Sequence, residues 1–331
     1  MATLAHTYAS LADLFQQQEG NGDIANIIEM LMQRTPVMRD GVVMECNNGA
    51  RHLTTVRTGL PAPTWRRLYQ GVTPTVGAQA QVEDVTGMME DWSEIDAKLV
   101  EMAKSPGKFR MNGARSHIQG MAHDLESTIF YGDTDSDPEK FMGLHPRFND
   151  LSAANGNQII DGAGTGSDNT SIWFITWGED SCHLLYPEGS KAGLTRDDKG
   201  KETKENSDGT LYDVYREKFT QDVGLSVRDW RGVARVANID VSDLTADAAT
   251  GADLIDLMID AYYQLDNPNQ PGGKTIGYCS KTIAKFLDKQ TMNGTNVQLT
   301  YAEAHGRKVP AFRGIPIEMA DAILETEAQI T

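Results

Sequence analysis

Three aspartates at alternate positions are the side chains of this sequence that most resemble a metal site. Asp133, Asp135 and Asp137 have the carboxylate spacing that begins a calcium-binding loop. Such a loop also needs glycine at its sixth position and glutamate at its twelfth, where this chain has Pro138 and Leu144. We therefore expect a connection between two elements, with Asp137 capping a turn that begins at Pro138. Weak cation binding is the alternative.

Two glycine-rich stretches resemble nucleotide-binding loops only in part. Residues 161–166 lack the GxGxxG spacing and precede a predicted strand, whereas a dinucleotide loop opens a helix. Residues 271–275 end in the Gly-Lys-Thr of a P-loop. However, Pro268 stands where the first glycine is required, and no helix is predicted to begin at Thr275. Both stretches are interpreted as loops.

The other reactive side chains form no catalytic pattern. The seven histidines include no HExxH motif and no pair four residues apart, and no serine lies in a GxSxG elbow. Three distant cysteines predict a reduced intracellular protein without a disulfide scaffold or a cysteine-built zinc site: Cys46, Cys182 and Cys279. We expect no enzyme activity, no cofactor and no metal. A hydrolase whose carboxylates come together from distant segments is the alternative from another class.

The charge of the chain is negative and unevenly distributed. A formal charge of −17 over 331 residues repels phosphate backbones and anionic lipids, so we expect neither nucleic acid nor membranes as direct partners. Residues 1–80 hold six arginines, six acids and no lysine, so their net charge is zero. The whole net negative charge therefore lies in residues 81–331. Arg228, Arg231 and Arg235 stand near Asp229, which predicts local ion pairs. No signal peptide or membrane-spanning run is visible, which predicts a soluble protein made in a cytoplasm.

The first third of the chain predicts an arm, a hairpin and two helices. Residues 1–36 contain a short amphipathic helix that ends at Pro36 and must dock on another surface. An Asn-Gly at positions 48 and 49 separates two β-rich runs, 42–46 and 52–56, which predicts a hairpin. A short helix is predicted over 94–102. A longer amphipathic helix of about five turns is predicted over 113–131.

The rest of the sequence alternates between strand and helix patterns. Strands are predicted over 172–176, 233–237 and 275–279, and helices over 252–265 and 280–290, with Ser280 as an N-cap. The polar stretch 191–210 predicts a surface excursion or mobile flap, and 309–319 is strand-like. This order predicts an α+β fold with a mixed sheet.

Three local sequences resemble major capsid proteins of tailed phages. Residues 129–133 (IFYGD) with 141–144 (FMGL) resemble the junction that follows the long spine helix of these proteins. Residues 177–190 contain WG and then YPEGS, and 312–324 contain FRGIPI and then DAIL. Both are similar to stretches of podovirus capsid proteins of the Bordetella phage BPP type. The resemblance covers nearly the whole chain and implies the Hong Kong 97-type capsid fold.

The resemblance also implies a division of the chain. Residues 1–36 would form the N-terminal arm and 37–80 the extended hairpin called the E-loop. The peripheral domain would comprise 81–132, with the spine helix at 113–131, together with 295–331. Residues 133–294 would form the axial domain.

The resemblance implies that copies of the chain assemble as pentamers and hexamers into an icosahedral head that encloses double-stranded DNA. The virion shell would then be its location and the host bacterial cytoplasm its place of assembly. Scaffolding protein and portal would be partners during assembly, and a cement protein afterwards. A nanocompartment shell or another virion structural protein, such as a tail component, is the alternative.

The predicted contacts between subunits lie on the arm and the E-loop. The arginines among them are expected to reach carboxylates of a neighbouring copy, because a guanidinium can bond a carboxylate through two parallel hydrogen bonds; solvated arginines are the alternative. The predicted contact residues are Leu14, Phe15, Ile24, Ile28, Arg51, Arg57, Trp65, Arg66 and Arg67. Some shells of this fold are cross-linked through an E-loop lysine. Residues 37–80 contain no lysine, so a non-covalent shell is expected.

Overall fold

The computed structural model describes residues 34–246, 251–266, 268, 273–293, 299–304 and 307–331. The predicted arm therefore lies outside the described residues, except for residues 34–36. The described chain forms two compact units. Unit 1 comprises residues 88–126 and 191–222, and unit 2 comprises 34–87, 127–190 and 223–331. Three elements contribute residues to both: β3 (Ala78–Asp96), α4 (Pro106–Tyr131) and β8 (Leu211–Val227).

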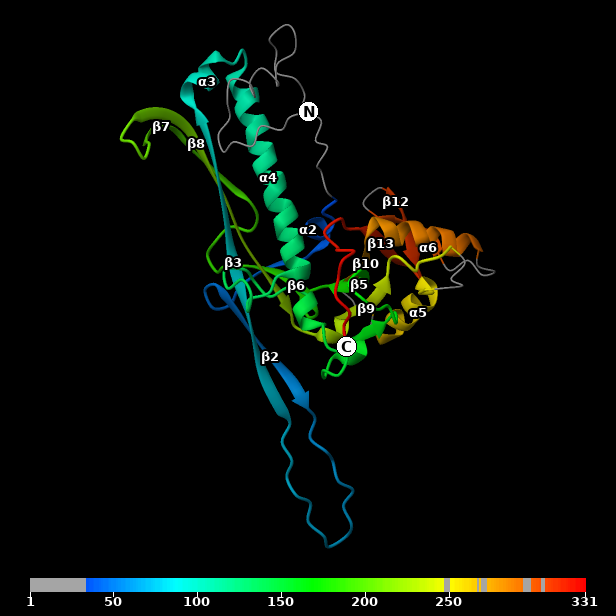
Figure 1. The fold of residues 1–331 in the computed structure, drawn as a ribbon. Coiled ribbons are helices and arrows are strands. Elements are labelled where there is room, and N and C mark those ends of the chain that lie inside the picture. The colour runs from blue at the N-terminus through cyan, green and yellow to red at the C-terminus, as the bar shows by residue number, and fades with distance from the viewer. Residues whose placement is uncertain (1–33, 247–250, 267, 269–272, 294–298, 305–306) are drawn as a thin grey trace. The chain divides into compact units, whose positions relative to one another are not determined.

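Unit 2 is built around apolar strands of a mixed sheet (Figure 1). β5 (Asn169–Trp177) is buried along its whole length and runs antiparallel to β9 (Val233–Asp240) and β10 (Lys274–Cys279). β10 runs parallel to β13 (Ile315–Met319), and β9 runs parallel to β4 (Ile159–Asp161). A strand covered on both faces has a continuous apolar sequence, which is why these segments could be predicted from their composition.

Two helices contribute to one apolar core with these strands. α5 (Leu254–Gln264) and α6 (Lys281–Asn293) contribute Met258 and Leu287 to the core, which includes Phe174 of β5 and Val236 of β9. The Ser280 Oγ accepts a hydrogen bond from the Ile283 amide at 3.3 Å, which confirms the predicted N-cap of α6.

Smaller elements complete unit 2. β1 (Val43–Glu45) pairs in parallel with β6 (Cys182–Tyr186), while β11 (Leu299–Ala304), β12 (Arg307–Phe312) and β13 form an antiparallel run. The remaining short helices are α2 (Val37–Asp40), η1 (His145–Arg147), η2 (Gly156–Gln158) and η3 (Trp230–Gly232). No helix within the described ranges has both the length and the apolar composition needed to cross a membrane.

Unit 1 contains α3 (Ala97–Met102), β7 (Thr195–Glu205) and parts of β3, α4 and β8. Its interior is small and apolar, with Phe109 packed among Ile95, Leu99 and Val100. Ion pairs supplement this core: Arg110 lies 2.7 Å from Asp198 and 2.5 Å from Glu217. The predicted flap at 191–210 is instead a regular hairpin, because β7 pairs with β8 from Thr195 to Glu205.

Some predicted boundaries are wrong. Residues 94–96 continue β3, and α3 begins at Ala97. The long helix begins at Pro106 rather than at 113, because proline is well accommodated in the first turn of a helix. The division of the chain into arm, E-loop, peripheral domain and axial domain stays a prediction.

The predicted pairing around Asn48-Gly49 is wrong as well. The run 42–46 pairs with β6 through β1, and β2 (Arg51–Gly59) pairs with β3. The Asn-Gly still makes a tight reversal, since Gly49 has a φ of +65° and Asn48 bridges to Arg51. Both arms of that reversal pair with strands from distant parts of the sequence.

Candidate assembly surface

The predicted E-loop contains a long hairpin formed by β2 and the first part of β3 (Figure 1). The antiparallel register runs from Arg51 opposite Val85 to Gly59 opposite Ala78, with a bulge before Gly59. Residues 60–77 connect the two strands. We call residues 60–77 the hairpin tip.

The base of this hairpin is held by directional contacts within unit 2. Arg147 lies 2.7 Å from the Asp84 carboxylate and also donates to the Met142 and Leu225 carbonyls. The side chain of Asn47 exchanges two hydrogen bonds of 2.8 Å with the backbone of Leu53. The Asp84 and Arg147 side chains are only 3% and 18% exposed. Such a buried ion pair is stabilising only when additional hydrogen bonds compensate for the lost hydration.

Two histidines complete this base. His183 is fully buried and its ring lies edge-on to that of His52, with 5.5 Å between centroids. Burial lowers the pKa of both imidazoles, so both are neutral near pH 7. The base of the hairpin therefore contains a packed and uncharged histidine pair beside the Arg147–Asp84 ion pair.

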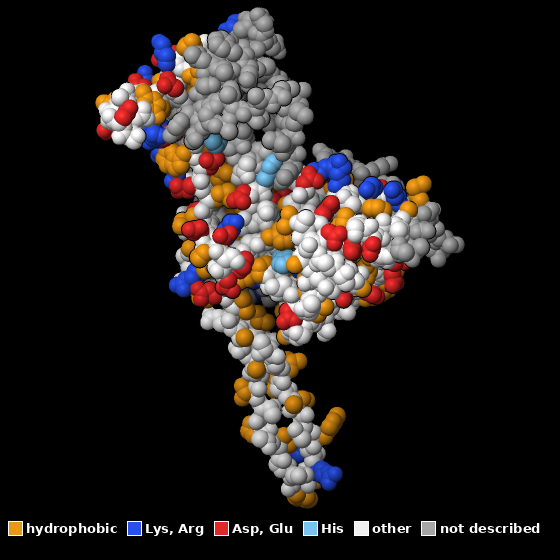
Figure 2. Space-filling model, viewed as in Figure 1, with side chains coloured by type: hydrophobic (Ala, Val, Ile, Leu, Met, Phe, Trp, Pro, Cys, Tyr) orange, Lys and Arg blue, Asp and Glu red, His pale blue; other side chains and the backbone are white. Residues whose placement is uncertain are grey.

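The hairpin tip has the opposite character. Trp65 is 99% exposed, Leu68 90% and Val76 92%, and Leu60 and Tyr69 are also almost uncovered. Figure 2 shows hydrophobic side chains along the whole length of this hairpin. Large apolar side chains gathered on one exposed segment mark a contact site, whereas single exposed ones are normal.

Local hydrogen bonds give the tip a defined turn. The Arg66 Nε donates to the Gln70 carbonyl at 3.0 Å, and the Gln70 amide donates to the Arg67 carbonyl at 3.2 Å. Tyr69 adopts a left-handed φ of +63° within this turn. A preformed turn reduces the conformational entropy that is lost when a partner binds.

The hairpin is also the cationic part of an acidic protein. Residues 46–82 contain four arginines and no lysine, aspartate or glutamate, in a chain with a formal charge of −17. Arg51 pairs with Glu83 at 2.9 Å, so its carboxylate partner is internal. Within the described ranges, no carboxylate pairs with Arg57, Arg66 or Arg67. Three of the predicted contact arginines are therefore available to a carboxylate of another molecule.

The structure brings together five of the predicted contact residues and leaves four undescribed. Arg51, Arg57, Trp65, Arg66 and Arg67 all lie exposed on the hairpin. Leu14, Phe15, Ile24 and Ile28 lie outside the described residues. Sequence reasoning missed the exposed apolar residues Leu60, Leu68, Tyr69 and Val76, although the absence of any acid between residues 46 and 82 could have identified the whole segment.

The aspartates considered for calcium bond their own loop. The Asp133 carboxylate accepts hydrogen bonds from Ser136 Oγ at 2.7 Å and from the Asp135 amide at 3.0 Å, which lowers its pKa. In the part of the chain that the structure describes, no three His, Cys, Asp or Glu side chains are placed to hold a metal ion.

In the described part of the chain, Arg231 is the member of the arginine series 228, 231 and 235 that forms the predicted local ion pair, with Asp229. Arg228 pairs with Asp180, and Arg231 pairs with Asp229 and Asp266 at the surface. Arg235 differs from both, because it is completely buried.

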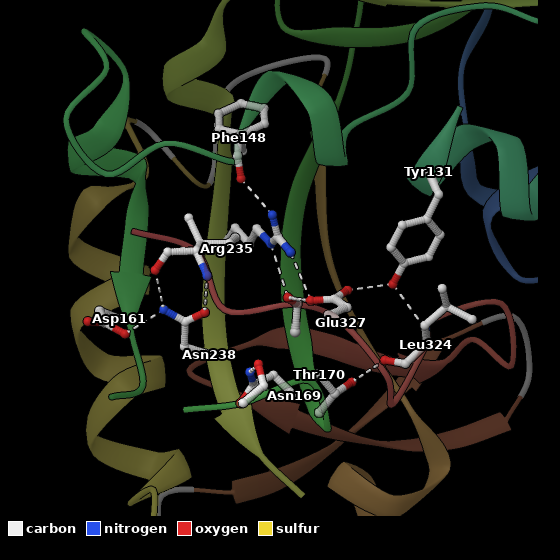
Figure 3. A network of polar contacts seen from close by, with 12 residues as sticks. Tyr131, Phe148, Asp161, Asn169, Thr170, Arg235, Asn238, Leu324 and Glu327 are labelled. Carbon is white, nitrogen blue, oxygen red and sulfur yellow. Dashed lines mark hydrogen bonds and ion pairs between the residues drawn. The ribbon is translucent and has the colours of Figure 1, made fainter. Parts of the chain in front are cut away.

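Arg235 is the centre of a buried polar network (Figure 3). Its guanidinium lies 2.8 Å from the Glu327 carboxylate and donates to Ser171 Oγ at 3.0 Å and the Phe148 carbonyl at 2.6 Å. The Tyr131 hydroxyl donates to the second oxygen of Glu327 at 2.5 Å and accepts from the Leu324 amide. Burial is the first cause that raises the pKa of Tyr131, so this phenol remains a donor.

A second set of bonds holds the last described residues beside this network. The Asn238 side-chain amide donates to the Ile330 carbonyl at 2.9 Å and accepts from the Ile330 amide at 2.8 Å. The backbones of Glu327 and Asn169 of β5 exchange two hydrogen bonds, with the Glu327 amide donating at 2.9 Å and the Asn169 amide at 3.3 Å. The network therefore fixes the segment 324–330 against β5 and β9.

Comparison with known proteins supports the capsid interpretation of this fold. A family model described as major capsid protein GP7 matches residues 19–331. A chain of the cryo-EM structure of bacteriophage Epsilon15 is 41% identical, with a TM-score of 0.79, and the match covers 100% of this chain and 99% of that one. No curated protein sequence matched the chain.

Other solved structures are similar at much lower identity. A capsid chain of bacteriophage JBD30 is 9% identical with a TM-score of 0.49, covering 89% of this chain and 93% of that one. The SrpI encapsulin of Synechococcus elongatus PCC 7942 is 10% identical with a TM-score of 0.45, covering 65% and 93%. The assignment of the family rests on the family model and the Epsilon15 similarity.

The fold is the α+β Hong Kong 97-type fold of tailed-phage capsid proteins. The chain belongs to the GP7 major capsid protein family. It is a structural protein of which many copies form a viral shell.

Proposed function

We propose that the chain assembles as pentamers and hexamers into the icosahedral head of a podovirus-type tailed phage, and that the hairpin tip docks on a neighbouring copy. The observation that carries this proposal is the contrast between the firmly held base of the hairpin and its exposed tip. Burial of Trp65, Leu68 and Val76 across a subunit boundary would supply assembly free energy that a single copy cannot obtain.

Charge favours a second copy of the chain as the partner of the tip. Arg57, Arg66 and Arg67 have no carboxylate partner among the described residues, and the copies that surround them are acidic. Each contact between copies can be weak, because a shell makes many of them at once.

The accessory partners belong to the same proposal. Scaffolding protein and portal act during assembly in the host cytoplasm, and a cement protein binds at the subunit junctions of the finished shell. The shell is held without isopeptide cross-links, since residues 37–80 contain no lysine. A denaturing gel of mature particles should therefore show one chain-sized band, and a ladder of covalent oligomers would contradict this part of the proposal.

The proposal is tested by sedimentation and electron microscopy of the full chain, expressed alone and with the phage scaffolding protein. Shells or discrete pentamers and hexamers are expected. A variant with Trp65→Ser, Arg66→Ser and Arg67→Ser should fold but stop before closed shells. If the wild-type chain stays monomeric under both conditions, the proposal is wrong.

A further inference from the structure

Helix α6 carries a row of lysines on the face opposite to its core contacts. Ile283 and Leu287 are buried, whereas Lys281, Lys285 and Lys289 are exposed at steps of four residues. Residues four apart lie on one side of a helix, about 6 Å from each other along its axis. The row is therefore a cationic stripe about two turns long.

These lysines have no ionic partner within the described part of the chain. Lys285 and Lys289 lie 4.7 Å and 5.1 Å from the centre of the Phe286 ring, and no carboxylate pairs with any of the three. Asp288 stands three residues after Lys285 and forms no ion pair with it. In a protein with a net charge of −17, three neighbouring lysines without an ion pair are unusual.

Helix α5 carries the complementary row. Leu254, Met258 and Ala261 are buried, and the exposed side holds Asp253, Asp256 and Asp260. Asp253 caps the helix by accepting from the Ile255 amide. Asp256 and Asp260 form no ion pair with the described residues, and they have the same four-residue step as Lys285 and Lys289.

Both stripes belong to unit 2, and no ion pair joins them among the described residues of one copy. α5 and α6 contribute to the same core cluster of unit 2. Figure 2 shows Lys and Arg side chains gathered in the region of α6, with Asp and Glu side chains in the neighbouring region of α5. Two different, complementary patches on one chain are the requirement for a heterologous contact, which closes into a ring when the rotation between copies allows it.

We propose that the lysine stripe of α6 binds the aspartate stripe of α5 on the adjacent copy, forming a contact that closes the capsomer ring. This proposal rests on the proposed function, since it needs a ring of identical chains. A second copy is the occupant that the charges favour, because each copy brings both a free cationic and a free anionic stripe of matching step. Because exposed ion pairs are screened by salt, ring formation through this contact weakens as ionic strength rises.

The test is a charge exchange in the full chain, followed by sedimentation and electron microscopy at low salt. The first variant carries Lys285→Glu and Lys289→Glu, and the second carries Asp256→Lys and Asp260→Lys. We expect each to lower the yield of rings and shells about tenfold or more, because two attractions per contact become repulsions around the whole ring. The variant with all four substitutions should recover assembly. Lys108→Glu with Lys191→Glu is the matched control for lost positive charge, since both lysines are exposed and unpaired.

Mixing the first two variants gives a sharper result. Only unlike copies then have complementary stripes, so alternating rings of six can form, while rings of five cannot. Hexamers without closed shells are the expected product of the mixture.

Two outcomes would overturn the proposal. One is assembly of both single-set variants like the control. The other is an assembly defect that the four-substitution variant does not repair, which would assign the lysines to a different partner such as DNA phosphates. In both cases wild-type shells would leave the proposed function intact. Absence of any wild-type oligomer would instead refute the proposed function first.

Discussion

The polar network around Arg235 and the hairpin tip lie in the same unit but satisfy their side chains in opposite ways. The Arg235 and Glu327 side chains are 0% and 2% exposed, and the guanidinium reaches three different acceptors. At the tip, Trp65 is 99% exposed, and Arg57, Arg66 and Arg67 have no described carboxylate partner. The network stabilises a single copy of the chain, whereas the tip can be satisfied only by another molecule. Stability and assembly are therefore properties of different residues, and substitutions should separate them.

The largest effect on stability is expected at the buried ion pair. Arg235→Met leaves the Glu327 carboxylate buried without a cation and should lower the free energy of unfolding by about 3–5 kcal/mol. The paired variant with Glu327→Gln as well should recover part of this loss, because it removes the unpaired charge. Denaturant unfolding measures both. A loss under about 1 kcal/mol for Arg235→Met would mean that the network does not stabilise the chain.

Substitution of two glycines by alanine compares a packed position with an exposed one through the space available for a Cβ atom. A Cβ at Gly132 would lie 2.5 Å from the Phe141 carbonyl oxygen and 2.6 Å from that of Thr128, and both are backbone atoms. Gly132→Ala should therefore cost about 2–3 kcal/mol. A Cβ at Gly71 of the tip meets nothing within 4 Å, so Gly71→Ala should change stability by less than about 0.5 kcal/mol. Equal changes in melting temperature for the two variants would contradict the expected difference between the packed surroundings of Gly132 and the open surroundings of Gly71.

Acid should destabilise the chain through His145, whose ring centroid lies 5.5 Å from that of Tyr131 in the network. Burial, then the positive charge of Arg235, lowers the pKa of His145 from 6.5 to about 4. Between these values the unfolded chain binds more protons than the folded chain, so stability is full above about pH 6.5 and falls as the pH approaches 4. Between pH 7.5 and pH 5, His145 should contribute about 2 kcal/mol to this loss. His145→Gln should show a smaller difference in unfolding free energy between pH 7.5 and pH 5 than the wild type, and an unchanged difference would refute this assignment.

The smallest effect on stability is expected at the tip. Trp65→Ser and Leu68→Ser replace side chains that are 99% and 90% exposed, so unfolding free energy should change by less than about 0.5 kcal/mol. The same variant should lose closed shells by electron microscopy. A variant that unfolds readily would show that the tip packs on its own copy instead.

The sequence predicts the interior of unit 2 well, because buried strands and amphipathic helices carry their own patterns. β5, β9 and β10 appear as apolar runs, and Ser280 marks the start of α6. The strand pairing was harder to predict, since Asn48-Gly49 identifies a chain reversal but not the strands with which its two arms pair. The Arg235–Glu327 pair was not predictable either, because its partners are 92 positions apart and a pair so distant in sequence gives no local signal.

The contact residues show the same limit. The arginines of the hairpin were predicted from composition, and the structure places them on one exposed segment. The residues that would bury these side chains lie on a second copy. Neither the sequence nor the fold of a single chain can therefore identify them.

The most direct test of the account is a cryo-EM reconstruction of the assembled particle. We predict that the hairpin tip of each copy is covered by a neighbouring copy, with Trp65 and Leu68 buried and Arg66 or Arg67 within 4 Å of a neighbour's carboxylate, the separation that defines an ion pair. A closed shell in which the tip stays exposed to solvent would contradict the central claim that this hairpin joins the subunits.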